Sequence, residues 1–484
     1  MNPLYDAIYP ALPLFAQNAV CTAAGYARYH SRFTSHFHEM LARWEETVHW
    51  PLERLHALQW ERLARQVRRA RSCVPYYRDL PEPSDASDPL VAIARTLEQI
   101  PPLEKWEYSD QPEAFLARDV PRYRLLRGRT SGTTGTALPL WSTPEVLAEE
   151  YATSWRMRRA CGVPGPASPN FTFNGNIVVP FRQTAPPFWR VSAYDHRILF
   201  SIFHMTPANL RAYAQAVRSL PASYVQGYPS AIHLVARQIL EEGGPLPPGR
   251  IHAVFTSSES LLAFQRETIE KAFSAPVRDR YGVSEKVVSM TECEAGSLHV
   301  DMEFCIVEVE VTEESDQWVS GPMLCTGLAD HATPMFRYRI GDVGTLSKRP
   351  CRCGRAGPAF LHVDGRMEDY VLTPDGRLIG RLDHIFKAQL DVSEAQIVQE
   401  TPQAVRVLLV PRASYTGASE RQLLKEMRAR LGNEIEIEVR LVEEIRREPN
   451  GKFRAVKSSV GRIERTHPAY ASTPEIGASR DGRV

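Results

Sequence analysis

Short apolar runs alternate with helical stretches between residues 130 and 365, and no other feature of the sequence limits the fold as strongly. Residues 251–255 form an apolar run typical of a buried strand, and residues 263–273 have the periodicity of a helix that follows it. In residues 304–311, valine and glutamate alternate as they do in a strand with one buried face. This pattern predicts an α/β fold with a large, multi-layer N-terminal domain.

The pattern changes after Asp364. Residues 405–410 and 435–441 are predicted strands, and the helix between them ends at Gly432. Its apolar residues share one face: Leu423, Leu424, Met427 and Leu431. This order indicates a compact α+β unit.

The chain has 484 residues, enough for more than one domain. We expect a large domain at residues 1–365, a small mobile α+β domain at 366–465 and a flexible tail at 466–484. In the small domain, Ser419 and Gln422 are predicted to form the capping box of the helix.

The composition excludes several classes of protein. Hydrophobic residues make up 43% and charged residues 24%, so the chain is neither disordered nor fibrous. With 58 basic and 57 acidic residues, the net charge of +1 gives no overall field that would attract nucleic acid. No apolar run approaches the ~18 residues of a membrane span, and Asp6 with no early basic cluster argues against a signal peptide. We therefore expect a cytoplasmic protein whose eight cysteines are reduced.

The helix predicted over residues 51–72 contains five arginines in its second half: Arg62, Arg65, Arg68, Arg69 and Arg71. We interpret them as a solvated helix face. A zinc-dependent nucleic-acid module is the alternative, and the net charge of +1 disfavours it.

Residues 130–136, TSGTTGT, combine two glycines with five hydroxyl side chains. Such a loop turns several backbone N–H groups toward one point and suits a polyphosphate. It lacks the Gly-Lys-Ser/Thr ending of a P-loop. Taken alone, an ordinary hydroxyl-rich turn is the simpler interpretation.

Four further motifs follow in order: YGVSE at 281–285, FRYRIGD at 336–342, GRMED at 365–369 and PNGKF at 449–453. Together with the first loop they resemble the adenylate-forming superfamily, which contains acyl-CoA synthetases, adenylation domains and luciferases. The resemblance is closer to phenylacetate–CoA ligase-like proteins, in particular the CapK-like branch, which shares QGYPS at 226–230 and a Cys-x-Cys-Gly-Arg segment. It covers about residues 40 to 460.

The resemblance implies roles only where the motifs match. The β- and γ-phosphates of ATP would lie under Thr130, Ser131, Gly132, Thr133, Thr134 and Gly135. The rest of the nucleotide would contact Tyr281, Gly282, Ser284, Asp342, Ser257 and Glu259. The substrate acid would contact Tyr228, Pro229 and Ser258. The catalytic residues would be Lys452, Glu285 as the Mg²⁺ ligand, and Arg366, with Asp369 as the hinge.

The activity implied is ATP-dependent activation of a carboxylic acid to an acyl-adenylate, followed by acyl transfer in a biosynthetic reaction. Mg²⁺ and Lys452 would neutralise the charge that builds up as pyrophosphate leaves. The alternative function is that of a non-catalytic nucleotide-binding protein that kept the fold. For the oligomeric state, a homodimer is possible.

The acceptor is expected to be an amine or a hydroxyl, with CoA as the alternative. The segment after the hinge reads Gly376-Arg377-Leu378-Ile379-Gly380, which departs from genuine phenylacetate–CoA ligases. Arg377 and Arg381 could still meet phosphates, although exposed arginines usually meet only water.

Four residues have the side chains of a structural zinc site: Cys293, His299, Cys351 and Cys353. Neither pair has the common C-x₂-C spacing, but similar positions recur in the phenylacetate–CoA ligase-like branch.

The acid itself is not determined by the sequence. Five aromatic residues suggest an aromatic or otherwise apolar acid, and a simple hydrophobic core is the alternative: Phe171, Phe173, Phe181, Phe188 and Trp189.

Overall fold

The structure is a computed structural model. It describes residues 8–129, 138–259, 261, 263–329, 332–364, 371–379, 382, 385, 391–412, 414–443, 445, 456–458 and 460. Helices and strands both contribute throughout, so the predicted α/β class is confirmed.

The helices are α2 (Leu14–Arg32), α3 (Ser35–Thr47), α4 (Leu52–Cys73), α5 (Pro89–Glu98), α6 (Lys105–Asp110), α7 (Pro144–Ala160), α8 (Pro207–Ser219), α9 (Pro229–Glu241), α10 (Ala263–Phe273) and α11 (Gly417–Leu431). Among the described residues, every helix is too short or too polar to cross a lipid bilayer.

The strands of the first half are β1 (Leu126–Arg129), β2 (Pro139–Ser142), β3 (Asn170–Asn174), β4 (Trp189–Ser192), β5 (Arg197–Ser201), β6 (Tyr224–Gly227), β7 (Val254–Ser257), β8 (Val277–Gly282), β9 (Ser289–Glu292) and β10 (Leu298–Val300). Those of the second half are β11 (Cys305–Val309), β12 (Glu313–Glu314), β13 (Trp318–Gly327), β14 (Tyr338–Ser347), β15 (Ala359–Asp364), β16 (Val371–Leu372), β17 (Leu378–Ile379), β18 (Val392–Thr401), β19 (Ala404–Pro411), β20 (Glu436–Leu441) and β21 (Val456–Ser458).

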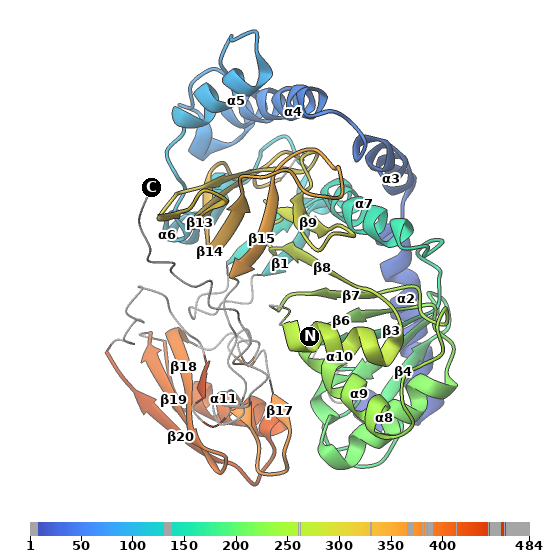
Figure 1. Ribbon diagram of the computed structural model, residues 1–484. Helices are drawn as coiled ribbons and strands as arrows, with labels where there is room; N and C mark the ends of the chain where they lie inside the picture. Colours follow the sequence, from blue (N-terminus) through green and yellow to red (C-terminus); the bar gives the residue numbers. More distant parts are fainter. Residues whose placement is uncertain are drawn as a thin grey trace, which may run out of the picture.

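One long sheet runs through the body of the molecule (Figure 1). Its order within the described chain is β11-β13-β14-β15-β10-β9-β8-β7-β6-β3-β5-β4. The stretch from β5 to β8 is parallel, and the strands from β9 to β11 are antiparallel. The parallel stretch therefore has helices on both faces, as such sheets require.

Helices α8, α9 and α10 cover one face of the parallel stretch, and α2 and α7 lie over the other (Figure 1). On the first face, Phe171 and Phe173 of β3 are fully buried in a core shared with these three helices. Phe188 belongs to the same core. Trp189 packs against this core, whereas Phe181 is half-buried outside it. Four of the five aromatic residues thus belong to core packing, which is the simpler of the two interpretations that the sequence left open.

The C-terminal residues form a smaller sheet of their own, β20-β19-β18-β21, which α11 covers (Figure 1). Its core comes from residues 371–456, including Val407, Leu423 and Met427. The predicted start of α11 was wrong. Thr416 is the N-cap and forms the capping box with Ser419. The helix thus begins at Gly417, two residues before Ser419. Serine and threonine both cap helices, so residue type alone does not distinguish Ser419 from Thr416 as the N-cap.

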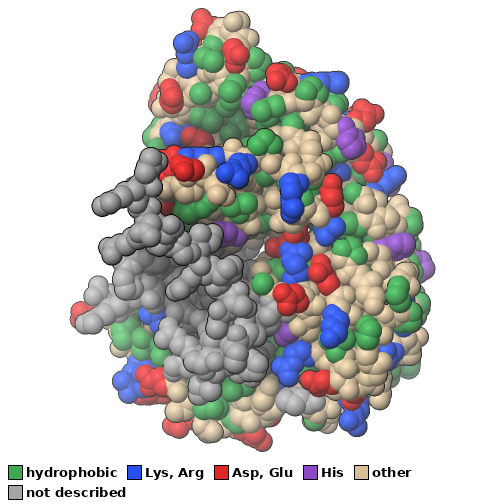
Figure 2. All heavy atoms as spheres, viewed as in Figure 1, with side chains coloured by type: hydrophobic (Ala, Val, Ile, Leu, Met, Phe, Trp, Pro, Cys, Tyr) green, Lys and Arg blue, Asp and Glu red, His purple; other side chains and the backbone are tan. Residues whose placement is uncertain are grey.

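The surface in Figure 2 carries basic and acidic side chains interspersed, as nearly equal numbers of the two predict. The prediction of a wholly solvated arginine face on α4 was wrong at one position. Arg62 is buried, and its Nη2 lies 2.5 Å from Oε2 of Glu149 on α7. This pairing depends on a helix that lies far away in the sequence, so α4 alone does not reveal it.

Candidate active site

Several predicted site residues lie outside the described residues: Thr130, Ser131, Gly132, Thr133, Thr134, Gly135, Arg366, Asp369 and Lys452. The remaining ones lie in three groups. The first is at the end of β8, the second is around the loops after β6 and β7, and the third is a Cys/His cluster.

The YGVSE motif and the aspartate of FRYRIGD meet at the end of β8. The Tyr281 hydroxyl donates a hydrogen bond to Oδ2 of Asp342 at 2.6 Å, and Asp342 is buried. Burial, together with this neighbouring carboxylate, raises the pKa of Tyr281, so the phenol stays protonated and donates. The half-buried Glu285 accepts from the Tyr338 hydroxyl at 3.4 Å. Residues of two distant motifs therefore meet through their side chains.

Gly282 and Ser284 continue this loop and are exposed. A carboxylate oxygen such as that of Glu285 is a ligand type that Mg²⁺ accepts, usually together with phosphate oxygens. Glu285 thus fits the metal role that the resemblance implies.

The QGYPS and Ser257-Ser258-Glu259 segments follow β6 and β7, which are neighbours in the parallel sheet. Pro229 begins α9, and Oε2 of Glu259 accepts from the Ser230 N–H at 3.3 Å. Ser258 has a positive φ of 73°, a strained conformation often found at functional loops.

Gly227 lets the two strands approach. Its φ is +147°, and a Cβ atom there would lie 1.9 Å from the carbonyl oxygen of Phe173 on β3. The next residue, Tyr228, donates its N–H to that same carbonyl at 2.8 Å. Glycine is therefore required at the last position of β6, directly before Tyr228.

A cavity of about 450 Å³ opens between α7, α2 and the strand ends. Gly227, Tyr228, Ser257 and Ser258 form part of its wall. Two of the three residues predicted to contact the acid, Tyr228 and Ser258, thus line one space with the end of β7, whereas Pro229 is buried and is not part of its wall. The size of the space suits a small-molecule ligand.

The opposite wall of the cavity is polar and was not predicted from the sequence. Asn170, Thr172 and Asn174 of β3 project into it, and the phenylalanines between them face the core. Five arginines also line it: Arg28, Arg32, Arg158, Arg197 and Arg280. In sequence, the NFTFN pattern of residues 170–174 indicates only a strand with one polar face.

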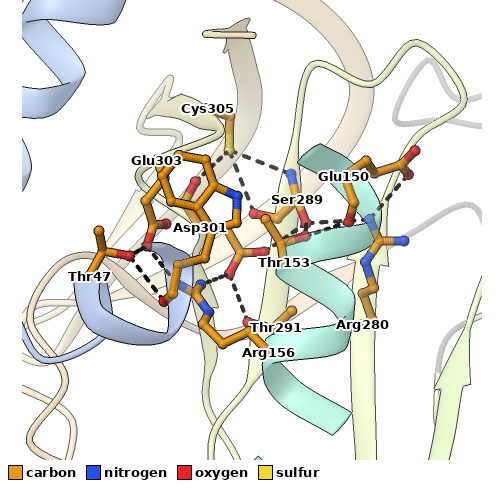
Figure 3. Close-up of polar contacts among 11 residues, drawn as sticks. Thr47, Glu150, Thr153, Arg156, Arg280, Ser289, Thr291, Asp301, Glu303 and Cys305 are labelled. Atoms are coloured by element: carbon orange, nitrogen blue, oxygen red, sulfur yellow. Dashed lines mark hydrogen bonds and ion pairs between the residues drawn. The ribbon is translucent and has the colours of Figure 1, made fainter. Parts of the chain in front are cut away.

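A buried polar network fixes α7 beside this cavity (Figure 3). Arg156 donates to Oδ1 of Asp301 at 2.6 Å and also bonds Glu303. Oδ2 of Asp301 accepts from Ser289 at 2.7 Å, and Ser289 lies 3.1 Å from the Thr153 hydroxyl. The series thus ties α7, β9 and the loop before β11 to one another.

At the other end of the network, Arg280 bonds Glu150 at 3.2 Å and Lys286 bonds it at 2.7 Å (Figure 3 shows the arginine). Burial alone would raise the pKa of Glu150, but the two cations outweigh it and lower the pKa to about 2. Glu150 is therefore ionised, and its charge is matched without help from a ligand.

The Cys/His cluster is brought together as predicted: Cys293, His299, Cys351 and Cys353 place their ligand atoms within 4.8 Å of one another. Sγ of Cys293 and Cys351 are 3.6 Å apart, and His299 Nε2 is 3.3 Å from Sγ of Cys353. A tetrahedral zinc ion with Zn–S bonds of ~2.3 Å separates its sulfur ligands by about 3.8 Å, so the geometry fits. Burial lowers the pKa of His299 to about 4, which keeps its imidazole neutral.

Arg377, which the sequence offered as a possible phosphate contact, is already bonded to protein groups. It pairs with Asp375 at 2.8 Å and donates to the carbonyls of Phe203, Arg430 and Leu431 at 3.0 to 3.2 Å. In this arrangement it joins the C-terminal residues to the loop after β5.

Comparison with known proteins shows what this chain is similar to. Residues 371–459 match the family model of the CapK C-terminal domain. Protein CapK of Staphylococcus aureus is 24% identical over 455 residues, which cover 92% of this chain and 98% of that protein. Indoleacetate–lysine synthetase of Pseudomonas savastanoi is 25% identical over 287 residues, covering 58% of this chain and 66% of that protein.

Among solved structures, a 2-hydroxyisobutyryl-CoA ligase bound to 2-HIB-AMP and CoA has a TM-score of 0.54. It is 18% identical and covers 86% of this chain and 92% of its own, so it shows a shared fold. Residues 371–459 therefore match the CapK C-terminal domain, the chain is similar to protein CapK over most of its length, and it shares the fold of 2-hydroxyisobutyryl-CoA ligase.

Proposed function

We propose that this protein activates a carboxylic acid with ATP and then transfers the acyl group to an amine or hydroxyl acceptor. The observation that carries the proposal is the pairing of Tyr281 with Asp342 near Glu285, together with a cavity that is lined by Tyr228, Ser258 and Arg280, the residue before Tyr281. A nucleotide site and an acid site side by side are what acyl-adenylate formation needs. The relatives' names support the same activity.

In the first step, an oxygen of the substrate carboxylate attacks the α-phosphorus of ATP, and the bond to the bridging oxygen of pyrophosphate breaks. We assign the ribose hydroxyls to Asp342 and the adenine edge to Tyr281. Residues 130–135 would cover the outer phosphates. Glu285 would hold Mg²⁺, which would supply charge neutralisation for the leaving pyrophosphate. Lys452 would bridge the carboxylate and the α-phosphate, with Arg366 beside the ribose.

In the second step, the acceptor nitrogen or oxygen attacks the acyl carbon and AMP leaves. We expect Asp369 to act as the hinge on which the small domain, residues 366–465, presents Lys452. An amine or hydroxyl acceptor is favoured over CoA because Arg377 is occupied by Asp375 and by carbonyl groups. CoA remains the alternative, since the solved relative with this fold is a CoA ligase. The cytoplasm is the expected compartment.

We further propose that Cys293, His299, Cys351 and Cys353 hold a structural zinc ion. Four protein ligands leave no open position for a reacting water, so the ion would stabilise the fold where β10 meets the loop after β9 and the loop between β14 and β15.

Pyrophosphate exchange into ATP tests the adenylation step. With an accepted acid, Lys452→Ala should lower the exchange rate ~100-fold or more, because a cation at the developing charge acts mainly on the transition state. ATP affinity should change by only a few-fold. Lys457→Ala, five residues further along the chain, is the matched control and should exchange at the normal rate. Exchange by Lys452→Ala at the rate of the unmodified protein would refute the assignment.

A non-catalytic nucleotide-binding protein predicts a different outcome. It would bind ATP, by calorimetry, but exchange no pyrophosphate with any acid. Adding CoA to an accepted acid separates the acceptor classes. Formation of acyl-CoA at the rate of AMP release would establish CoA as the acceptor.

A further inference from the structure

The cavity beside α7 has a wall of a kind that protein interiors rarely contain. Asn170 and Thr172 are each 1% exposed, although they are polar and lie on the face of β3 opposite the core phenylalanines. Burying polar side chains costs free energy unless they are hydrogen-bonded. The face of β3 beneath α7 therefore has the character of a recognition surface.

The wall has many hydrogen-bond donors and few acceptors. The Thr172 hydroxyl oxygen accepts from Nε and Nη2 of Arg197 at 3.3 and 3.1 Å, and also from Gln226 at 3.2 Å. Oδ1 of Asn170 accepts from Gln226 at 3.1 Å and from Thr172 at 2.8 Å. The few neutral acceptors are thus shared among several N–H and O–H groups.

Arg158 shows the imbalance most clearly. Its Nη2 donates to Oε1 of Gln226 at 3.1 Å, and its Nη1 donates to the Ser154 carbonyl at 3.0 Å. Within the part of the chain that the structure describes, its Nε is buried and has no hydrogen-bond partner, and no carboxylate pairs with it. Burial lowers the pKa of Arg158, yet an arginine remains charged at neutral pH.

Arg197 is only loosely paired. Its Nη1 lies 3.9 Å from Oδ2 of Asp195, whereas Arg28 holds the same oxygen at 2.6 Å. Of the two carboxylates that line the cavity, Asp195 is thus taken by Arg28, and Glu150 by Arg280 and Lys286. Three more arginines than carboxylates line the space. A ligand with negatively charged oxygens would correct this imbalance.

We propose that the acid activated here carries a second anionic group, a carboxylate or a phosphate, which Arg158 and Arg197 hold while the reacting carboxylate lies toward Tyr228 and Ser258. The inference rests on the proposed function, because it names the substrate class of that same site. It replaces the apolar acid that the aromatic residues suggested, since Phe171 and Phe173 face the core and not the cavity.

The first test compares acids matched in carbon skeleton. Pyrophosphate exchange by the full chain is measured with butyrate against succinate, benzoate against phthalate, and glycerate against 3-phosphoglycerate. The dicarboxylate and phosphate arms distinguish the two sources of the second charge. We expect at least one dianionic acid to exceed its monoanionic counterpart in kcat/KM by ~100-fold or more. A monoanionic acid that matches or exceeds every dianion would overturn the inference.

The second test removes the cation. With the accepted dianion, Arg158→Gln should raise KM by ~30-fold or more and change kcat by only a few-fold, because the contact is made equally in ground and transition states. Arg158→Lys should recover part of this loss, since it restores the charge without the two-pronged geometry. Arg159→Gln is the control: it removes an exposed arginine from the same helix and should leave KM unchanged. Equal KM values in Arg158→Gln and Arg159→Gln would overturn the inference.

The third test needs no catalysis and separates this inference from the adenylation assignment. Each acid is added to the protein without ATP, and the thermal midpoint is followed. Dianions should raise the midpoint of the unmodified protein and of Arg159→Gln, but not that of Arg158→Gln or Arg197→Gln. If this occurs while no acid supports exchange, the anion site stands and the adenylation assignment fails. If no dianion shifts any midpoint, the anion site is refuted.

Discussion

Arg156 and Arg158 lie two residues apart on α7 and face opposite sides of the helix. Arg156 pairs with the carboxylates of Asp301 and Glu303 and donates to the Trp44 carbonyl, so its charge is matched inside the protein even though its Nε, like that of Arg158, has no hydrogen-bond partner among the described residues. Arg158 lines a cavity and bonds only neutral acceptors. The same side chain is thus a structural element on one face of the helix and a group that awaits a ligand on the other.

The largest effect is expected at Arg156. Arg156→Gln leaves Asp301 and Glu303 as buried carboxylates without their cation, which costs about 3–5 kcal/mol of the free energy of unfolding. Urea denaturation measures the loss. The control Arg159→Gln should change the free energy by less than about 0.5 kcal/mol. Similar stabilities for the two variants would show that the network in Figure 3 is not structural.

Glu150 lies between the two settings, because it both lines the cavity and pairs with cations of the protein. Its pKa is lowered to about 2 in the folded state, so its stabilising effect is present above its ordinary pKa of 4.5 and is lost as the pH falls from 4.5 toward 2. At about 1.4 kcal/mol per unit, this amounts to about 3 kcal/mol.

Glu150→Gln should therefore flatten the fall in stability between pH 4.5 and pH 2, the ordinary and the lowered pKa of this carboxyl, as measured by urea midpoints at each pH. Glu145→Gln, an exposed position on α7, serves as the control. Identical acid slopes in the unmodified protein and Glu150→Gln would mean that Arg280 and Lys286 do not hold this carboxylate ionised.

The Cys/His cluster is the reverse of the arginine-lined cavity: here the protein would supply negatively charged thiolates, and the bound ligand would be a zinc cation. Cys351→Ser should lower the thermal midpoint by about 5 °C, because structural zinc is coupled to folding. Cys73→Ser, which is outside the cluster, should not. Elemental analysis of protein purified without chelator should give one zinc per chain, and its absence would remove the proposal.

The smallest effect on stability is expected at Arg158. Arg158→Gln breaks no ion pair among the described residues; it removes hydrogen bonds to neutral groups and contacts with the Trp155 and Phe255 rings, so the free energy of unfolding should fall by only about 1 kcal/mol. Urea denaturation again provides the measurement. A loss as large as that of Arg156→Gln would make Arg158 a structural residue too, and the contrast between the two faces of α7 would fail.

The sequence predicted the parts of this molecule that depend on local patterns. Helix α10 spans the predicted residues, 263–273, because its periodicity and its boundaries are local. The Cys/His cluster was predicted from residue types and the resemblance, and the structure brings its four members together.

Features that depend on distant packing could not be predicted. Asn170, Thr172 and Asn174 have the alternation of a strand with a solvated face, but α7 and α2 cover that face and enclose a cavity. Arg62 has the spacing of a surface residue, but Glu149 lies opposite it. In each case a segment far away in the chain decides what the side chain meets.

The close crossing at Gly227 has a consequence for protein engineering. A library designed to change the accepted acid would naturally vary the residues next to Tyr228, but any side chain at position 227 would push β6 away from the Phe173 carbonyl and disturb the sheet itself. Diversity is better introduced at Asn174 and Gln226, whose side chains line the cavity and make no such backbone approach. A library should therefore vary the cavity-lining side chains and keep Gly227 unchanged.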